Sequence, residues 1–290
     1  MGRHYLNNEL DVNYDRQAIA VAMGEEAEQE NTYQLFRVYW TPSMSFAFSK
    51  QQVVVKTRIS YAHQAYRQSR TGHLWVDPSI QWNWKVSALS SFSADVGYTN
   101  SPLTGKSIYD TPIFTTYRTQ KINQGKTAVT HDLRATATYK YANPVWGVFL
   151  NVSPMYARTS GNILYENVLN DRIFTIVATD KKRATETTGL SGHISKTFGW
   201  AKTLLGLGAS FTTTDYCMLV TGKVNVARMT VTSVALNFSL RPTRLLSVEG
   251  RSSVSFNQQK NQTAPQLSSG STNDWEHRLN IHVFPANGWM

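Results

Sequence analysis

The sequence contains a single cysteine, Cys217, which excludes an intramolecular disulfide framework. It also lacks any uninterrupted apolar run of about 20 residues, and this excludes a helical membrane protein. Charged residues make up only 17% of the chain, which is low for a soluble domain. Because no linker or break in composition divides the 290 residues, we expect one region over residues 1–290.

No secretory signal is visible at the start. The chain passes from Met1 directly into an alternating pattern, without the apolar segment that such a signal requires. An exported protein needs this signal. Either the chain is a mature or truncated form, or an interpretation that requires export is wrong.

Residue patterns that carry chemistry are missing as well. There is no paired-cysteine or HExxH pattern for a metal. His131 and Asp132 are neighbours on one expected strand, so they point to opposite faces and cannot cooperate in one site. We therefore expect no catalytic residues, no metal and no cofactor, and predict that the chain is not an enzyme.

The net charge of +10 raises the question of nucleic-acid binding. Lysine and arginine are scattered singly, with no basic stripe and no RNA-binding motif. We expect no nucleic-acid partner. The charge is better explained by a polar lumen and by loops that face an anionic outer leaflet.

What the sequence has instead is alternation of apolar and polar side chains. Residues 128–156 alternate for about fourteen positions, turn at Ala142-Asn143-Pro144, and alternate again. One face of the first arm carries Val129, His131, Leu133, Ala135, Ala137, Tyr139 and Tyr141, and the other carries Thr130, Asp132, Arg134, Thr136, Thr138 and Lys140. This pattern predicts a β-hairpin with one apolar and one polar side.

The length of these arms points to a membrane. Strands in soluble domains are typically about 5 to 6 residues long, whereas an arm of about fourteen residues spans roughly 45 Å. Tilted by about 45°, it would cross the apolar band of about 25 Å that an outer-membrane barrel presents to lipid. The mean hydropathy of -0.35 agrees with a barrel that has a lipid face and a polar lumen.

Similar alternation recurs along the whole chain. We predict twelve strands near residues 3–15, 33–48, 52–67, 73–86, 89–100, 128–142, 145–158, 185–198, 202–216, 226–241, 245–258 and 273–284. Short extensions around residues 114–118 and 173–178 would lengthen strands beyond the membrane.

The connections between the predicted strands alternate in length. Tight turns are expected around residues 49–51, 87–88, 142–144, 199–201 and 242–244, and mostly longer loops at 16–32, 101–127, 159–184, 217–225 and 259–272. Outer-membrane barrels have short periplasmic turns and long extracellular loops, so we place the tight turns on the periplasmic side.

Aromatic residues gather next to the tight turns, on the parity of the apolar face. They make up 12% of the chain. Such barrels carry aromatic girdles at both membrane interfaces. We therefore predict a membrane-interface role for Phe46, Phe48, Trp82, Trp84, Tyr139, Tyr141, Trp146, Phe198 and Phe238.

Hairpins such as "FSLRPTRLLSVEGRSSVSF" (residues 238–256) and "YANPVWGVFLNVSPMYARTSG" (residues 141–161) resemble those of TonB-dependent receptor-like outer-membrane proteins. This resemblance in hairpin style covers nearly the whole chain. It implies an all-β fold, an antiparallel up-and-down transmembrane β-barrel with about 12 long amphipathic strands here, as a fragment of a barrel of about 22 strands. It also implies uptake of a large nutrient or chelate across the bacterial outer membrane.

The same resemblance implies partners. Family members place a globular plug ahead of the barrel, and neither this plug nor the segment that contacts TonB is present here. The expected partners are outer-membrane lipid and lipopolysaccharide, together with the remaining barrel and plug. The energy-coupling protein would act only through that plug. No functional residue of the family can be transferred, because the matching motifs are absent.

Three loops contain candidate contacts. Residues 101–126 include Tyr109, Phe114 and Tyr117, which we name as candidate substrate contacts. The acidic stretch 24–30 and the basic stretch 180–183 suit ordinary solvated loops, or contacts with divalent ions and lipopolysaccharide phosphates.

Two alternatives remain open. One is a closed twelve-stranded barrel that acts as a passive channel, an adhesin or a barrel enzyme; pairing of the first and last predicted strands would support it. The other is a soluble β-protein. For the membrane hypothesis we expect Leu133 near mid-bilayer, so that Leu133→Lys costs about 2 to 4 kcal/mol.

Overall fold

A computed structural model describes residues 3–21, 29–66, 69–102, 112–123, 129–170, 173–220, 222–263 and 269–284. The fold is all-β. The strands are β1 (Arg3–Val21), β2 (Gln29–Ala47), β3 (Gln51–Tyr66), β4 (Ser69–Lys85), β5 (Ser90–Pro102), β6 (Ile113–Thr116), β7 (Thr119–Ile122), β8 (Val129–Asn143), β9 (Val148–Gly161), β10 (Leu164–Asn170), β11 (Ile173–Thr179), β12 (Arg183–Phe198), β13 (Thr203–Val220), β14 (Lys223–Thr243), β15 (Leu246–Asn261) and β16 (Gly270–Val283).

Helical structure is confined to one short turn. In the described part of the chain, only the 3-10 turn η2 (Trp200–Lys202) is helical. None of those residues belongs to a helix whose length and apolar character would suit a bilayer crossing.

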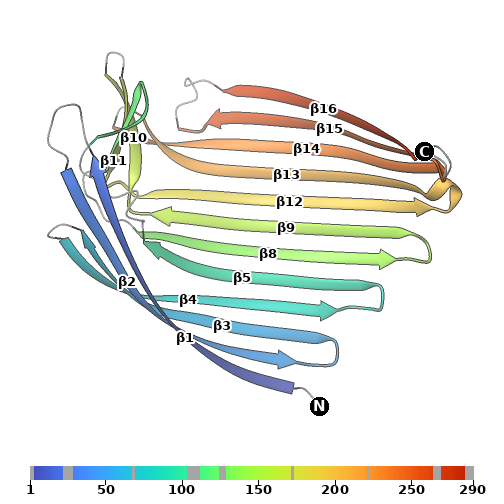
Figure 1. Cartoon of the computed structure of the whole chain (residues 1–290), viewed down its shortest axis with the longest axis horizontal. Helices are drawn as coiled ribbons and strands as arrows, with labels where there is room; N and C mark the ends of the chain where they lie inside the picture. The colour runs from blue at the N-terminus through green and yellow to red at the C-terminus, as the bar shows by residue number, and fades with distance from the viewer. Residues whose placement is uncertain are drawn as a thin grey trace, which may run out of the picture.

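Twelve long strands form one antiparallel meander, in the order β1-β2-β3-β4-β5-β8-β9-β12-β13-β14-β15-β16 (Figure 1). All twelve predicted strands are found at the expected places, and most are longer than predicted, up to 21 residues in β14. The twelve strand predictions are therefore confirmed. Period-2 alternation was a sufficient signal because each strand has one apolar and one polar side.

Four short strands form a branch at one end of the meander. β10 pairs with β11 and also runs parallel to β13 through Glu166 and Leu219, while β11 runs parallel to β7, which pairs with β6. The sequence predicted extensions near residues 114–118 and 173–178. These segments instead build separate hairpins, so the purely antiparallel up-and-down expectation holds only for the twelve long strands.

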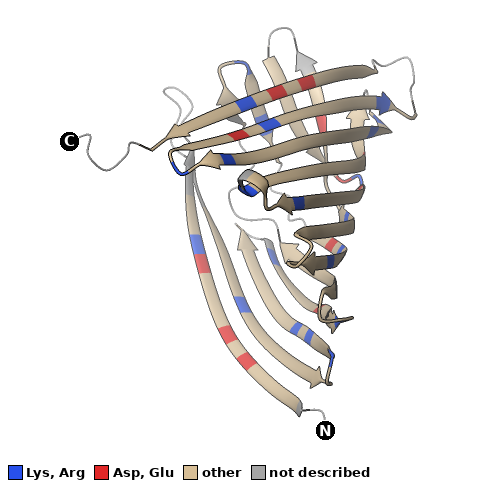
Figure 2. Cartoon of the chain, turned by 90° about the vertical axis from the view of Figure 1, so that its right-hand side faces the viewer, with Lys and Arg blue, Asp and Glu red and all other residues tan. Residues whose placement is uncertain are grey.

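The sheet is open. Among the described residues, β1 pairs only with β2, and β16 pairs only with β15. Figure 1 shows these two strands at opposite margins of the sheet, and Figure 2 shows the sheet curving between them. The alternative of a closed twelve-stranded barrel is therefore wrong for this structure, because it requires β1 and β16 to pair.

The two ends of the sheet differ, and we name them by their connections. The turn end contains the connections β2–β3, β4–β5, β8–β9, β12–β13 and β14–β15, and the loop end is the opposite one. One expected long loop is wrong: Val220 pairs with Lys223, so residues 217–220 and 223–225 belong to β13 and β14. Gly222, between these strands, has φ 76, a conformation that favours glycine.

The hairpin β8–β9 turns slightly later than predicted. Asn143 accepts a hydrogen bond on its side-chain oxygen from the backbone N–H of Trp146, at 3.0 Å. Gly147 has φ 62, and a side chain there would place Cβ 2.6 Å from the carbonyl oxygen of Thr197. β9 therefore begins at Val148 rather than 145, and Trp146 belongs to the turn.

Pairing in register keeps all side chains of one parity on the same side, which gives the sheet an apolar face and a polar face. The buried side chains of β2, β3 and β4 lie on the polar face, which is the concave side. A small cluster there comprises Tyr33, Leu35, Ala62, Tyr66 and Trp75. Buried polar residues of the same face include Thr41, Ser60 and Asp77.

Candidate functional site

The apolar face presents a continuous band of exposed hydrophobic side chains, which we call the belt. It crosses all twelve long strands, because the register aligns apolar positions of neighbouring strands. Leu207, for example, lies between Ile194 and Leu236. One representative from each strand is Leu10, Trp40, Val55, Ile80, Val96, Ala135, Val152, Ile194, Leu207, Leu236, Val254 and Leu279.

The belt is oblique to the hydrogen-bonded rows of the sheet. In β1 the apolar stretch runs from Leu6 to Tyr14 and centres on Leu10. The row that starts at Leu10 reaches position 217 of β13 when the register is followed from strand to strand, with the β4–β5 and β12–β13 pairings extended by a few residues. In β13, however, the apolar stretch from Leu205 to Phe211 has its midpoint at position 208, nine positions closer to the turn end.

This offset measures the inclination of the strands to the belt. Nine residues along a strand are roughly 30 Å, and the eight strand-to-strand steps from β1 to β13 are roughly 38 Å, which corresponds to about 38°. Strands of outer-membrane barrels tilt by about 35 to 45°. The belt would therefore lie level around a barrel whose strands have the usual tilt.

The belt is too large for an ordinary soluble surface. Twelve strands about 4.8 Å apart, each with an apolar stretch roughly 26 Å long as in β1, give an area on the order of 1,500 Å². The largest apolar patch of a typical soluble monomer is about 300 to 600 Å². Mid-belt side chains such as Leu207 and Phe211 are nearly half exposed, at 47% and 48%.

Leu133 does not lie where the sequence suggested. In β8 the apolar stretch runs from Leu133 to Tyr141 and centres on Ala137. Leu133 is four residues from this centre, or roughly 11 Å along the belt normal. It marks the loop-side margin of the belt, and the mid-belt expectation for it is wrong.

Charged side chains follow the belt on its loop side. The register places Arg158, Glu186, Asp215, Arg228 and Lys260 in one row across β9, β12, β13, β14 and β15. Arg228 binds Asp215 with two hydrogen bonds of 2.7 Å, and Arg158 lies 3.3 Å from Glu186. The hydrogen bond from Arg228 lowers the pKa of Asp215.

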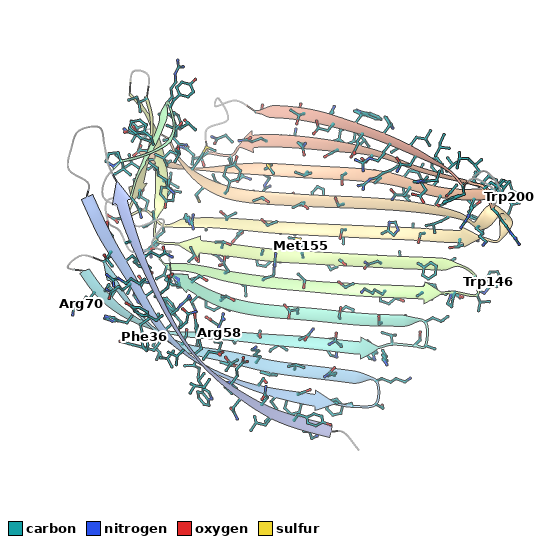
Figure 3. The ribbon with its side chains drawn as sticks, viewed as in Figure 1. Phe36, Arg58, Arg70, Trp146, Met155 and Trp200 are labelled. Carbon is teal, nitrogen blue, oxygen red and sulfur yellow. The ribbon has the colours of Figure 1, made fainter. Side chains whose placement is uncertain are left out.

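Aromatic side chains lie at the other margin, near the turn end. The nine predicted residues are all placed in this region, and Figure 3 shows Trp146 and Trp200 there. Trp82 contacts Phe92 with ring centroids 5.3 Å apart and stacks on Trp84 at 5.8 Å. Sequence reasoning missed Phe92 and Trp200, although both stand next to predicted tight turns.

The polar face carries a cavity of about 670 Å³ over β1 to β5. Its lining includes Glu9 and Asp11 from β1, Lys56 and Arg58 from β3, and Asp77 from β4. A second cavity of about 560 Å³ adjoins it through Ser79, Gly97 and Thr99 and continues to Asp132 and Arg134 of β8. The sequence predicted a polar lumen face but not these cavities.

Asp77 is the buried anchor of the first cavity. Its carboxylate accepts hydrogen bonds from Arg58 Nε at 3.2 Å, from the Asn100 backbone N–H at 2.9 Å and from Asn100 Nδ2 at 2.7 Å. Its side chain is 5% exposed. These three donors compensate the carboxylate for the loss of water.

The smooth remainder of the polar face has a different composition. Across β9, β12, β13 and β14 it is made mainly of serine, threonine, alanine and glycine. Hydroxyl pairs such as Thr187 with Thr214 at 3.1 Å, and Ser210 with Ser233 at 2.7 Å, connect neighbouring strands. On the polar face, this hydroxyl-rich region therefore lies between the charged residues of β1 to β8 and those of β15 and β16, such as Arg251 and Arg278.

The structure describes two of the three candidate substrate contacts at the loop end. Tyr109 lies outside the described residues. Phe114 lies on β6, and Tyr117 is 85% exposed in the β6–β7 turn, with the Arg118 guanidinium 5.1 Å from its ring centre. Of the two charged loops, residues 24–28 are also outside the described part. Lys181 donates a hydrogen bond to the carbonyl of Gly222.

The branch of short strands holds its own cation–π contact. The Lys121 ammonium lies 4.5 Å from the ring centre of Tyr165. Burial, followed by the charge of Arg183, lowers the pKa of Lys121, and burial raises the pKa of Tyr165. The pair helps to fix β7 against β10 at the loop end.

Within the described ranges, no group of three or more His, Cys, Asp or Glu side chains is arranged to hold a metal ion. No protein-family model matches the chain, and no curated protein matches it. Function is therefore inferred from the two faces of the sheet.

Proposed function

We propose that the chain forms part of the wall of a bacterial outer-membrane barrel, of the TonB-dependent receptor-like kind, that takes up a large nutrient or chelate. The single observation that carries the membrane placement is the belt, which is level at a strand tilt of about 38°, within the usual range for such barrels. A soluble protein would have to cover this surface.

The margins of the belt support the same orientation. Aromatic rings lie at the turn end and a row of paired charges lies at the loop end, as expected for the two interfaces of a bilayer. In this orientation the short turns are periplasmic, and the branch of β6, β7, β10 and β11 is extracellular.

The open margins favour a larger barrel. β1 and β16 would expose unpaired N–H and C=O groups to lipid, which is costly without water to bind them. Further strands would satisfy these groups, and the plug and energy-coupling partner of the family would belong to that larger assembly. In this proposal the chain supplies wall, lumen surface and loops, and it performs no catalysis.

Lipid quenching tests the membrane placement. Purified protein is mixed with vesicles that contain brominated phospholipids, and tryptophan fluorescence is recorded. Tryptophans of the belt, such as Trp40, should be quenched, whereas Trp75 of the polar face should not; single-tryptophan variants separate the two. Equal quenching of both, or failure of the protein to float with vesicles, would refute the placement.

A transport assay tests the assignment to a larger barrel. This chain alone, reconstituted in liposomes, should show no energy-coupled uptake, because the coupling partner acts through a plug. Coupled uptake by this chain alone would contradict the proposal.

A further inference from the structure

We infer that the 670 Å³ cavity on the polar face is a binding site for a small zwitterion, a molecule with one ammonium and one carboxylate group such as a free amino acid or a dipeptide. The inference deepens the uptake role proposed above, on which its biological meaning rests. It is carried by opposite charges that face the same cavity and do not pair with each other.

The anionic side of the site is on β1. Glu9 and Asp11 both line the cavity and both are exposed. Neither carboxylate has a hydrogen-bond or ion-pair partner among the described residues. Two adjacent free carboxylates on one strand face form a strong acceptor for an ammonium group.

The cationic side is on β3. Lys56 is exposed, and its ammonium has no partner within the described part of the chain. Arg58 uses its Nε for Asp77 at 3.2 Å, and its guanidinium lies 5.5 Å from the ring centre of Tyr39. The terminal amino groups of Arg58 thus remain available as a fork for a carboxylate.

β2 keeps the two sides apart. Glu9 pairs with Thr41, and the register on both sides of Thr41 places it opposite Arg58. Since neighbouring strands are about 4.8 Å apart, the backbones of β1 and β3 are roughly 10 Å from each other at this height. Among the described residues, no ion pair joins the carboxylates of Glu9 and Asp11 to Lys56 or Arg58.

The gap has the dimensions of a small ligand. If the charged groups keep the spacing of their strands, about 2.8 Å for a charge-assisted hydrogen bond at each side leaves roughly 4 Å between the charged groups of a bound molecule. This value lies between the charge separation of a free α-amino acid and that of an extended dipeptide. Thr41 and Tyr39, between the two sides, offer a hydroxyl and an aromatic ring for the remaining atoms.

Asp77 holds the site in shape. It is buried, and its Oδ2 accepts a hydrogen bond from Arg58 while its Oδ1 accepts two from Asn100. Arg58 is therefore pre-positioned, and the ligand does not have to order it. Figure 3 shows Arg58 on the early strands of the sheet, away from the belt aromatics at the turn end.

Equilibrium dialysis of the full chain in detergent, with radiolabelled glycylglycine as the probe, tests the inference. Two blocked forms are competitors: N-acetylglycylglycine lacks the ammonium, and glycylglycinamide lacks the carboxylate. Unlabelled glycylglycine should displace the probe, and each blocked form should compete at least about 10-fold less well, since one charged contact is lost.

Variants locate the site. Glu9→Gln with Asp11→Asn should weaken glycylglycine binding at least about 10-fold, and Lys56→Gln should weaken it as well, because each removes charge on one side. The matched control is Glu249→Gln with Arg251→Gln, which removes one charge of each sign from the polar face of β15, outside this cavity. Arg58→Lys keeps the charge and Asp77 paired but removes the fork.

The possible results distinguish a failure of the zwitterion site from a failure of the membrane placement. Three results would each overturn the zwitterion site. The blocked dipeptides could compete as well as unlabelled glycylglycine, or the control variant could lose as much binding as the cavity variants. The third result is that no saturable binding is found at millimolar probe. None of these results changes the lipid quenching of the belt. Conversely, failed vesicle insertion with intact zwitterion binding would refute only the proposed function.

Discussion

Replacement of Leu207 by arginine should destabilise the protein in a lipid bilayer by about 2 to 4 kcal/mol, the cost of a cation at the midplane on the lipid face of a barrel. Leu207 lies next to the centre of the belt in β13. Its cross-strand neighbours, Ile194 and Leu236, are apolar and offer no partner for a guanidinium.

Depth and face can be tested in one series. Leu133→Arg, roughly 11 Å from the belt centre, should cost only up to about 1 kcal/mol, because the penalty falls near the interface. Ser253→Arg is the matched control: Ser253 lies at nearly mid-belt height in β15, but its side chain belongs to the polar face. We expect Ser253→Arg to be close to neutral.

Equilibrium unfolding by guanidinium chloride in lipid vesicles, followed by tryptophan fluorescence, measures the three differences. The order Leu207→Arg, Leu133→Arg, Ser253→Arg should hold from largest to smallest cost. If Leu133→Arg costs more than Leu207→Arg, the belt has been positioned at the wrong height. If Ser253→Arg costs as much as Leu207→Arg, the two faces have been exchanged.

Three further predictions concern packing and pH. Gly250→Ala should lower stability by about 1 to 3 kcal/mol, because an added Cβ overlaps the ring of Phe238; Phe238→Leu in the same chain should restore much of the loss in urea unfolding. Tyr33 keeps its proton when folded, because burial raises its pKa from 10.0 to about 12. Stability should therefore fall as the pH rises from about 10 towards 12, and Tyr33→Phe should reduce this alkaline loss in a pH series of unfolding midpoints. The lowered pKa of Asp215 contributes stability above the unfolded value of 3.8, and this contribution disappears as acid protonates the folded state. Asp215→Asn should flatten that acid dependence, and an unchanged acid limb would exclude the pair with Arg228 as its source.

Local pattern was enough to predict the strands and their faces. The arm from Val129 to Asn143 is an example, because its alternation is a property of consecutive residues. Apolar and polar side chains that alternate over fifteen positions indicate a β-strand. The tight turns and the aromatic residues beside them follow from the same pattern. The expectation of a long loop at residues 217–225 was wrong because β13 runs on to Val220 and β14 begins at Lys223, so little turn composition surrounds Gly222.

The site required pairing between distant segments. Glu9, Arg58 and Asp77 are far apart in sequence and carry no motif, and they share one cavity only because the register of β1 to β4 puts them at one height. The candidate loop contacts Tyr109, Phe114 and Tyr117 stay a prediction, because Phe114 and Tyr117 lie on the β6–β7 hairpin and Tyr109 lies outside the described residues.

The sequence by itself determined that the chain is all-β, which strands it has and which side of each is apolar, because side-chain alternation is local. Only the tertiary structure decided that β1 and β16 remain unpaired, that the belt crosses the hydrogen-bonded rows at about 38°, and that unpaired charges of both signs meet on the concave face. These properties depend on the register between neighbouring strands and on the curvature of the sheet, and neither can be derived from the sequence of a single strand.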